Sequence, residues 1–169
     1  SVVSDAPGYL PAYKNVFEWS LHEERDDLAV RLLRNMKKYF PDYIEGKLME
    51  ASYLQNVDQL ESENICREIL NRRFSERAGI ILVSILRSQQ RYNDIIQYAE
   101  TTGKKWMYME SLFDAYIALK KYDDCRSFLM KEMVHRKNMR GLYLLGKMEV
   151  LQGEDPTLYW EKLIRDKPE

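Results

Sequence analysis

The chain has 169 residues, with 26 Lys and Arg against 27 Asp and Glu, and its formal net charge is −1. Apolar residues make up 45% of the sequence and charged residues 31%, which is typical of one globular unit and excludes a disordered or collagen-like chain. The near-zero net charge argues against a nucleic-acid-binding protein, because phosphate neutralisation by a basic surface supplies most of the affinity in such complexes.

The same sequence features indicate an intracellular protein. No stretch approaches the roughly 18 consecutive apolar residues of a membrane helix, so we expect no membrane insertion. The opening segment SVVSDAPGYLPAY lacks the basic and apolar regions of a secretory signal. Cys66 and Cys125 are too few for a disulfide scaffold. We therefore expect a soluble protein of the cytoplasm or nucleus.

Apolar residues recur at helical spacing along the chain, which predicts an all-α fold. Short helices are expected in pairs. The first helices of these pairs cover 12–22, 43–54, 77–88, 107–119 and 139–152. The second helices cover 26–36, 63–73, 93–103, 123–133 and 156–166. Local signals agree with these limits, since Asp155 before Pro156 predicts a helix N-cap, and Gly103 and Gly153 fall at expected helix ends.

The second helices are similar to one another and carry one apolar anchor each. In chain order these anchors are Leu33, Leu70, Ala99, Leu129 and Trp160, at spacings of 37, 29, 30 and 31 residues. A single short pair cannot bury its own apolar face, so a recurrence of this length predicts stacked pairs, that is, an α-solenoid. After an extended segment at 1–10, the expected repeat domain covers 11–169. Its approximate repeats are 11–41, 42–75, 76–105, 106–138 and 139–169.

The fourth repeat shows a known pattern most clearly, with Trp106, Leu112, Tyr116, Tyr122 and the small Cys125. On these residues the chain resembles the tetratricopeptide repeat (TPR) family, whose unit is a helix–turn–helix of about 34 residues. The resemblance implies a right-handed superhelix of about five antiparallel helix pairs.

Two repeats depart from the family's length. The second is lengthened around 56–62, and the third is about one helical turn shorter before Trp106. Small or aliphatic side chains at Ala29, Cys66 and Cys125 would allow the two helices of a pair to approach closely, and Ile95 replaces the small residue in the third repeat.

No pattern of catalytic residues is present. His22 and His135 are too far apart in the sequence for a multi-histidine motif, and the chain has no nucleophile elbow, P-loop or dinucleotide fingerprint. Cys66 and Cys125 both fall at the small-residue position of a repeat, so we interpret them as buried packing thiols. We expect no enzymatic activity, no metal and no cofactor.

The resemblance to the TPR family implies that the first helices line a concave groove for a peptide or partner helix. The positions carried over from the family are Lys14, Glu18, Leu21, Glu50, Tyr53, Arg77, Ser84, Arg87, Glu110, Asp114, Ile117, Tyr143, Lys147 and Val150. Their alternating charge favours a ligand of mixed charge over a polyanion, although the same charges could simply solvate one face. A carboxylate clamp is disfavoured, because Glu18 stands where that clamp has Asn.

Two alternatives to a groove-binding adaptor stay open. Val150, Leu151 and Trp160 could form an apolar terminal interface, which would fit a homodimer or a subunit of a larger assembly such as a ubiquitin ligase or chaperone complex. The basic turn at 131–140 could contact RNA, although cations at the end of a helix also have a purely structural explanation.

Overall fold

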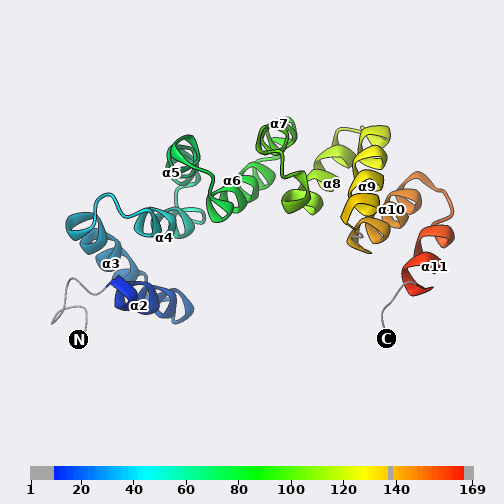
Figure 1. The fold of residues 1–169 in the computed structure, drawn as a ribbon. Helices are drawn as coiled ribbons and strands as arrows, with labels where there is room; N and C mark the ends of the chain where they lie inside the picture. The colour runs from blue at the N-terminus through cyan, green and yellow to red at the C-terminus, as the bar shows by residue number, and fades with distance from the viewer. Residues whose placement is uncertain (1–9, 137–138, 166–169) are drawn as a thin grey trace. The chain divides into compact units, whose positions relative to one another are not determined.

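The structure is a computed structural model that describes residues 10–136 and 139–165, and no β-strand occurs within these ranges (Figure 1). The all-α prediction is therefore confirmed. The first helices are α2 (Leu10–His22), α4 (Ile44–Leu54), α6 (Glu76–Ser88), α8 (Met109–Ala118) and α10 (Met139–Gln152). The second helices are α3 (Asp26–Tyr39), α5 (Gln59–Arg72), α7 (Tyr92–Thr102), α9 (Tyr122–Arg136) and α11 (Thr157–Arg165). The extended segment expected at 1–10 lies outside the described residues except for Leu10, which begins α2.

The chain divides into two compact units, residues 1–85 (unit 1) and 86–169 (unit 2), with the boundary inside α6. In unit 1, α2 packs on α3, α3 on α4, and α4 on α5. In unit 2, α7 packs on α8, α8 on α9, α9 on α10, and α10 on α11. Consecutive helices thus bury one another's apolar faces within each unit, as a repeat fold requires.

Three of the five predicted anchors, Leu33, Ala99 and Leu129, are buried, whereas Leu70 and Trp160 are half-buried. In unit 1, Tyr13 and Phe17 of α2 pack with Leu32 and Met36 of α3 and with Met49 of α4. The small-residue positions are completely buried in both units. These positions are Ala29, Cys66, Ile95 and Cys125. The expectation that the two cysteines are buried is confirmed.

The turns inside four helix pairs share one backbone geometry. Glu24, Gln90, Lys120 and Gly153 adopt left-handed φ values of 55°, 56°, 56° and 81°. In each turn the following N–H donates to the carbonyl five positions earlier, as in Arg25 N–H to Ser20 O at 2.8 Å and Lys121 N–H to Tyr116 O at 2.8 Å. This is the Schellman arrangement, which satisfies carbonyls left open at a helix end.

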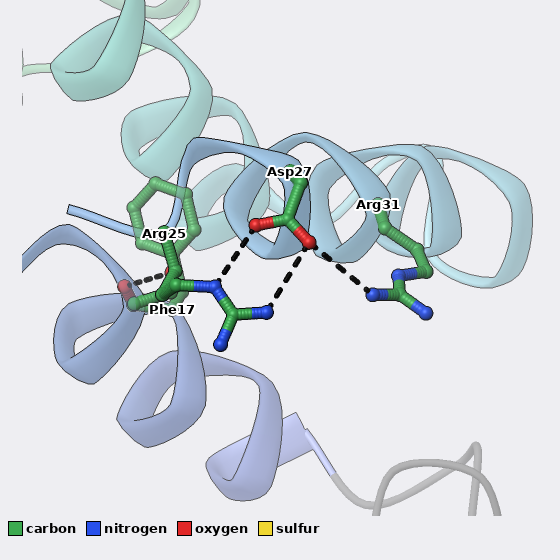
Figure 2. Close-up of polar contacts among 5 residues, drawn as sticks. Phe17, Arg25, Asp27 and Arg31 are labelled. Atoms are coloured by element: carbon green, nitrogen blue, oxygen red, sulfur yellow. Dashed lines mark hydrogen bonds and ion pairs between the residues drawn. The ribbon is translucent and has the colours of Figure 1, made fainter. Parts of the chain in front are cut away.

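Figure 2 shows the first of these turns, where Asp27 in the first turn of α3 lies between two guanidinium groups. Arg25 Nε donates to Asp27 Oδ1 at 3.1 Å, and Arg31 Nη2 lies 3.9 Å from Asp27 Oδ2. The hydrogen bond from Arg25 lowers the pKa of the Asp27 carboxyl. An acidic first turn is also favoured by the N–H groups at the start of the helix.

The two irregular repeats differ in their connections. In the second pair, Asp58 caps α5 by accepting from the N–H of Glu61 at 3.1 Å, so α5 begins four residues earlier than predicted. In the third pair, α7 ends before Gly103, whose φ is 62°, and the one-turn 3-10 helix η1 (Lys105–Tyr108) leads into α8. The predicted cap of α11 is present, since Asp155 Oδ1 accepts from the N–H of Thr157 at 2.9 Å.

Candidate functional site

The exposed side of the first helices in each unit is the candidate binding surface, and we call it the first-helix face. In unit 1 its charges form a connected set. Glu45 Oε1 of α4 lies 3.9 Å from Lys14 Nζ of α2 and accepts a hydrogen bond from Arg77 Nη1 of α6 at 2.5 Å. Lys14 and Arg77 are therefore brought together through a carboxylate that is not among the positions carried over from the TPR family.

The two α4 residues that the sequence analysis did select lie elsewhere. Glu50 pairs with Lys37 of the second helix α3 at 2.5 Å, and only 14% of its side chain is exposed. Tyr53 is half-buried against the apolar core of unit 1. The structure thus joins Glu50 to a second helix and not to Lys14 or Arg77.

In unit 2 the first-helix face is also joined by charge. Arg87 forms an ion pair with Asp114 of α8. Arg140 of α10 donates to Glu110 of α8 at 2.6 Å and lies 5.0 Å from the centre of the Tyr143 ring. Arg140, which the sequence analysis assigned to a basic turn, therefore belongs to this face.

One further contact links α8 and α10. The ammonium group of Lys147 lies 5.3 Å from the centre of the Phe113 ring, so this cation is held above an aromatic face. Of the charged positions carried over from the TPR family, Glu18 and Lys147 are exposed without an ion pair or hydrogen bond among the described residues.

The sequence contains a regular spacing of charges that identifies Glu45 and Arg140 as members of the first-helix face. One charge of alternating sign occurs per first helix, at Lys14, Glu45, Arg77, Glu110 and Arg140, with spacings of 31, 32, 33 and 30 residues. These spacings match the length of the repeat, whereas Glu50 does not fit them. Equivalent positions of neighbouring repeats stack, so this regularity would have predicted Glu45 and Arg140 as partners of Lys14 and Glu110.

Apolar side chains remain exposed between these ion pairs. In unit 1, Ile80 lies on the same stripe of α6 as Arg77 and Ser84 and is 50% exposed, and Leu21 of α2 is also exposed. Ser84 is itself engaged, because its hydroxyl accepts from Gln55 Nε2 at 2.8 Å. In unit 2, Tyr143 and Val150 of α10 are exposed and Ile117 of α8 is half-buried. Ile80 was not selected from the sequence.

The expected terminal patch is present in part. Val150 and Leu151 are exposed, but Trp160 is half-buried and its indole Nε1 is inaccessible. The indole packs against Gly146, where an added Cβ would lie 2.0 Å from Nε1. The prediction that Trp160 belongs to an exposed patch is therefore wrong, because the absence of a side chain at Gly146 of α10 lets the Trp160 indole of α11 pack against α10.

The last helix pair is also held by a largely buried carboxylate. Glu149 of α10 is 5% exposed and forms an ion pair with Arg126 of α9. The Arg126 guanidinium lies 3.4 Å from the Tyr159 hydroxyl of α11. Hydrogen bonding to Glu149 raises the pKa of Arg126. Because Arg126 of α9 contacts both Glu149 of α10 and Tyr159 of α11, this one cation links three helices.

The two cysteines are poorly suited to covalent chemistry, because both thiols are buried. Burial raises the pKa of Cys66 to about 11 and that of Cys125 to about 12, so both remain neutral thiols at neutral pH and are poor nucleophiles. Within residues 10–136 and 139–165 no three His, Cys, Asp or Glu side chains could hold one metal ion. None of the described helices has the length and apolarity needed to cross a membrane. The side chains of His135 to Asn138, in the basic turn considered for RNA, lie outside the described set.

No protein-family model matches the chain, and no curated protein matches it significantly in sequence. Solved structures do match. The structure titled "MamA RS-1 ArsTM double mutant" is 13% identical with a TM-score of 0.67, and the match covers 92% of each chain. "MamA 41-end from Desulfovibrio magneticus RS-1" is 16% identical with a TM-score of 0.66, covering 92% of this chain and 93% of that one.

The fold is a TPR-type helical repeat. This agrees with the resemblance found in the sequence and accounts for the recurrence of the Schellman turns. At 13–16% identity, the match to these structures is evidence for the fold alone.

Proposed function

We propose that the chain is a non-enzymatic protein-binding scaffold whose first-helix faces hold a peptide or a partner helix. The observation that carries this proposal is the exposure of Leu21, Ile80, Tyr143 and Val150 between charges that neighbouring helices already hold in place. Apolar side chains within a polar surround are typical of a protein interface. Because the charges are already ordered, binding costs the scaffold little conformational entropy.

The TPR-type fold supports this proposal in a general way, because stacked helix pairs expose extended surfaces that are suited to binding another chain. An intracellular location belongs to the same proposal, and the two buried free thiols are consistent with a reducing compartment.

The apolar contribution is tested by purifying partners from a native extract with wild type and with Ile80→Ser/Val150→Ser. The matched control is Val57→Ser/Leu60→Ser, which removes two exposed apolar side chains near the start of the second helix α5. We expect partners to be lost with the first variant and retained with the control. If both variants retain the same partners, the first-helix faces are not the binding surface.

A test of whether the charged residues of the first-helix face contact the partner needs a different set of variants. Arg77→Glu/Arg87→Glu would place a carboxylate beside Glu45 and another beside Asp114, so loss of binding would be mixed with loss of stability. Lys14→Glu/Glu45→Lys/Arg77→Glu instead reverses all three charges and keeps each neighbouring pair opposite in sign. We propose that the predicted charged residues contact the partner, so the reversed variant should fold normally and bind at least tenfold more weakly. Unchanged binding would mean that these charges only join the helices.

A second candidate, an assembly subunit, is favoured by the last helix pair. Val150, Leu151 and Leu158 are 52%, 53% and 75% exposed on the two sides of the Gly153 turn. Light scattering over a wide range of protein concentration tests self-association through this surface. A mass that rises with concentration in wild type, but not in Leu151→Ser/Leu158→Ser, would support this candidate over the first.

A further inference from the structure

An apolar pocket of about 290 Å³ lies in unit 1 where α3 meets α4. Its walls come from the last turns of α3, the connection to α4 and the first turns of α4, the segments seen from blue to cyan in Figure 1. We call it the α3–α4 pocket. Glu45, which joins the charges of the first-helix face in unit 1, does not line it, so the pocket is separate from that face.

The floor of the α3–α4 pocket is part of the hydrophobic core of unit 1. Leu33 and Met36 line the pocket and belong to the buried core cluster, and Phe40 packs against that cluster. Gly46 lines the pocket from α4, where an added Cβ would lie 3.1 Å from Met36 Cε. An apolar group that enters the pocket therefore exchanges water for apolar side chains, which favours its binding.

The lining of the pocket is suited to an aromatic ring. Phe40 and Tyr43 contribute two rings, and Met36 contributes a thioether. Tyr43 is exposed and stands beside Pro41, which has no N–H group to offer a polar ligand. Aromatic rings pack favourably against the edges and faces of other rings and against thioether sulfur. This lining favours an aromatic ring over a branched aliphatic group.

The three charged side chains that line the pocket are already paired. Lys37 Nζ lies 2.5 Å from Glu50 Oε1, and Lys47 Nζ donates to Glu68 Oε1 at 2.8 Å. The backbone N–H of Tyr43 donates to a carbonyl as well. A charged ligand would lose hydration here without gaining an uncompensated partner, so the balanced charge of the rim selects an uncharged group.

The volume of the pocket sets the size of that group. A cavity of roughly 150 Å³ in an engineered protein holds benzene. A pocket of about 290 Å³ therefore accommodates a bicyclic ring such as an indole, but it lies at the lower limit of the volumes that hold larger ligands. Tryptophan is among the residue types that most often anchor a protein interface by filling a pocket of this kind.

We propose that the α3–α4 pocket receives an uncharged aromatic side chain, of the size of tryptophan, from a partner protein. The ring contacts Met36, Phe40 and Tyr43, while the two ion pairs stay formed at the rim. The assignment of the ring to a partner rests on the proposed scaffold function, whereas the preference of the pocket for an uncharged ring rests on its lining alone.

The test uses the full chain with ¹³C-methyl-labelled methionine, in which Met36→Leu identifies the Met36 signal. The chain is titrated up to about 10 mM with N-acetyltryptophanamide and with N-acetylleucinamide, which has the same backbone and an aliphatic side chain. We expect saturable shifts of the Met36 methyl signal with the tryptophan probe, with a Kd on the order of 1 mM. The leucine probe should bind at least fivefold more weakly, and so should the charged indoles tryptamine and indole-3-propionate.

A variant at the mouth of the pocket assigns the contact. Tyr43→Ser removes one aromatic wall and leaves a residue that is well suited to the N-cap of α4, so the helix should be retained. Binding of the tryptophan probe should weaken at least threefold. The matched control is Tyr39→Ser, which removes an exposed ring that does not line the pocket and should bind as wild type does. Thermal unfolding checks that both variants are folded.

A second variant tests the role of the ion pairs. Lys37→Gln leaves the Glu50 carboxylate at the rim without its cation. Tryptamine should then bind at least threefold more tightly than it binds wild type, because its ammonium group takes the place of Lys37. Unchanged tryptamine binding would show that the rim charges do not select an uncharged ligand.

Three further results would overturn the proposal. These are the absence of saturable shifts at Met36, equal binding of the tryptophan and leucine probes, and binding of free indole without binding of N-acetyltryptophanamide, which would make the pocket a site for a small molecule. The probes report on the pocket alone, whereas Ile80→Ser/Val150→Ser reports on the first-helix faces. Failure of this proposal is therefore distinguishable from failure of the scaffold proposal.

Discussion

Cys66 and Cys125 are completely buried, and desolvation raises the pKa of both thiols well above the ordinary value. Residue type alone would allow these cysteines to be reactive, but the thiolate is the nucleophilic form and burial suppresses it. Both side chains occupy the small-residue position of their repeat, so their role is in packing. For these two cysteines, burial therefore decides that the side chain serves in packing and not as a reactive nucleophile.

Neither cysteine should react with a thiol reagent at about pH 8 until the protein unfolds. Because the folded-state pKa values exceed the unfolded value near 9, the stability that these thiols contribute is present below about pH 9 and falls as pH rises toward 11–12. Urea unfolding at pH 8 and 10 measures this loss, which should be smaller in Cys66→Ala/Cys125→Ala. Fast labelling of the native protein would contradict the burial.

Gly146 and Gly141 lie in the same helix, α10, and we expect replacement by alanine to change the stability of the protein in opposite directions at the two positions. An added Cβ at Gly146 would lie 2.0 Å from Trp160 Nε1, whereas at Gly141 it would make ordinary contacts, the nearest being Leu129 O at 3.5 Å. Gly146→Ala should therefore destabilise the protein by about 1–3 kcal/mol through overpacking. Gly141→Ala should stabilise it by about 0.5–1 kcal/mol through helix propensity.

Urea unfolding followed by tryptophan fluorescence measures both changes. In Gly146→Ala the native emission of Trp160 should also shift toward that of an exposed indole. Equal stability of the two variants would mean that Trp160 does not pack on Gly146.

At the scale of elements, the recurrent feature is the Schellman turn that joins the first and second helices of four pairs. Only Gly153 is glycine, whereas Glu24, Gln90 and Lys120 hold the same left-handed backbone with a side chain present. A left-handed L-residue costs about 1–2 kcal/mol, so packing of the two helices must impose the conformation. This explains why glycine marks only one of the four turns in the sequence.

Glu24→Gly should stabilise the protein by about 0.5 kcal/mol, because relief of the left-handed strain outweighs the entropy that glycine loses on folding. Glu23→Gly is the matched control, since it removes the same charge from an exposed neighbour that lacks a positive φ. The control should be destabilised. Thermal unfolding of both variants compares them directly, and a control that gains as much stability as Glu24→Gly would refute the strain.

At the scale of the whole molecule, the chain is organised as two compact units, and consecutive helices pack on one another from α2 to α5 in unit 1 and from α7 to α11 in unit 2. In such a fold, stability is approximately a sum of terms for single repeats and for contacts between adjacent repeats. A local defect should therefore loosen nearby helices without opening distant ones.

Hydrogen exchange can test this locality. In Gly146→Ala, backbone amides of α10 and α11 should exchange faster, whereas those of α2 to α4 in unit 1 should keep their wild-type protection. Uniform loss of protection across both units would show that the chain unfolds as one cooperative body.

The sequence by itself determined the helices, the buried small-residue positions and the family resemblance. Each of these depends on local periodicity or on regular spacing, and both can be read along one chain. Ala29 and Cys125 were predicted as buried from their place in the repeat, and Asp155 from the capping chemistry next to Pro156.

Only the tertiary structure decided which charges meet and which apolar side chains stay exposed. Glu45 rather than Glu50 joins Lys14 and Arg77, because five residues rotate a side chain by about 140° around a helix and so move it to another face. Trp160 is covered by α10 because Gly146 offers no side chain. Contacts of this kind depend on the packing of helices about 30 residues apart in sequence, which local patterns do not encode.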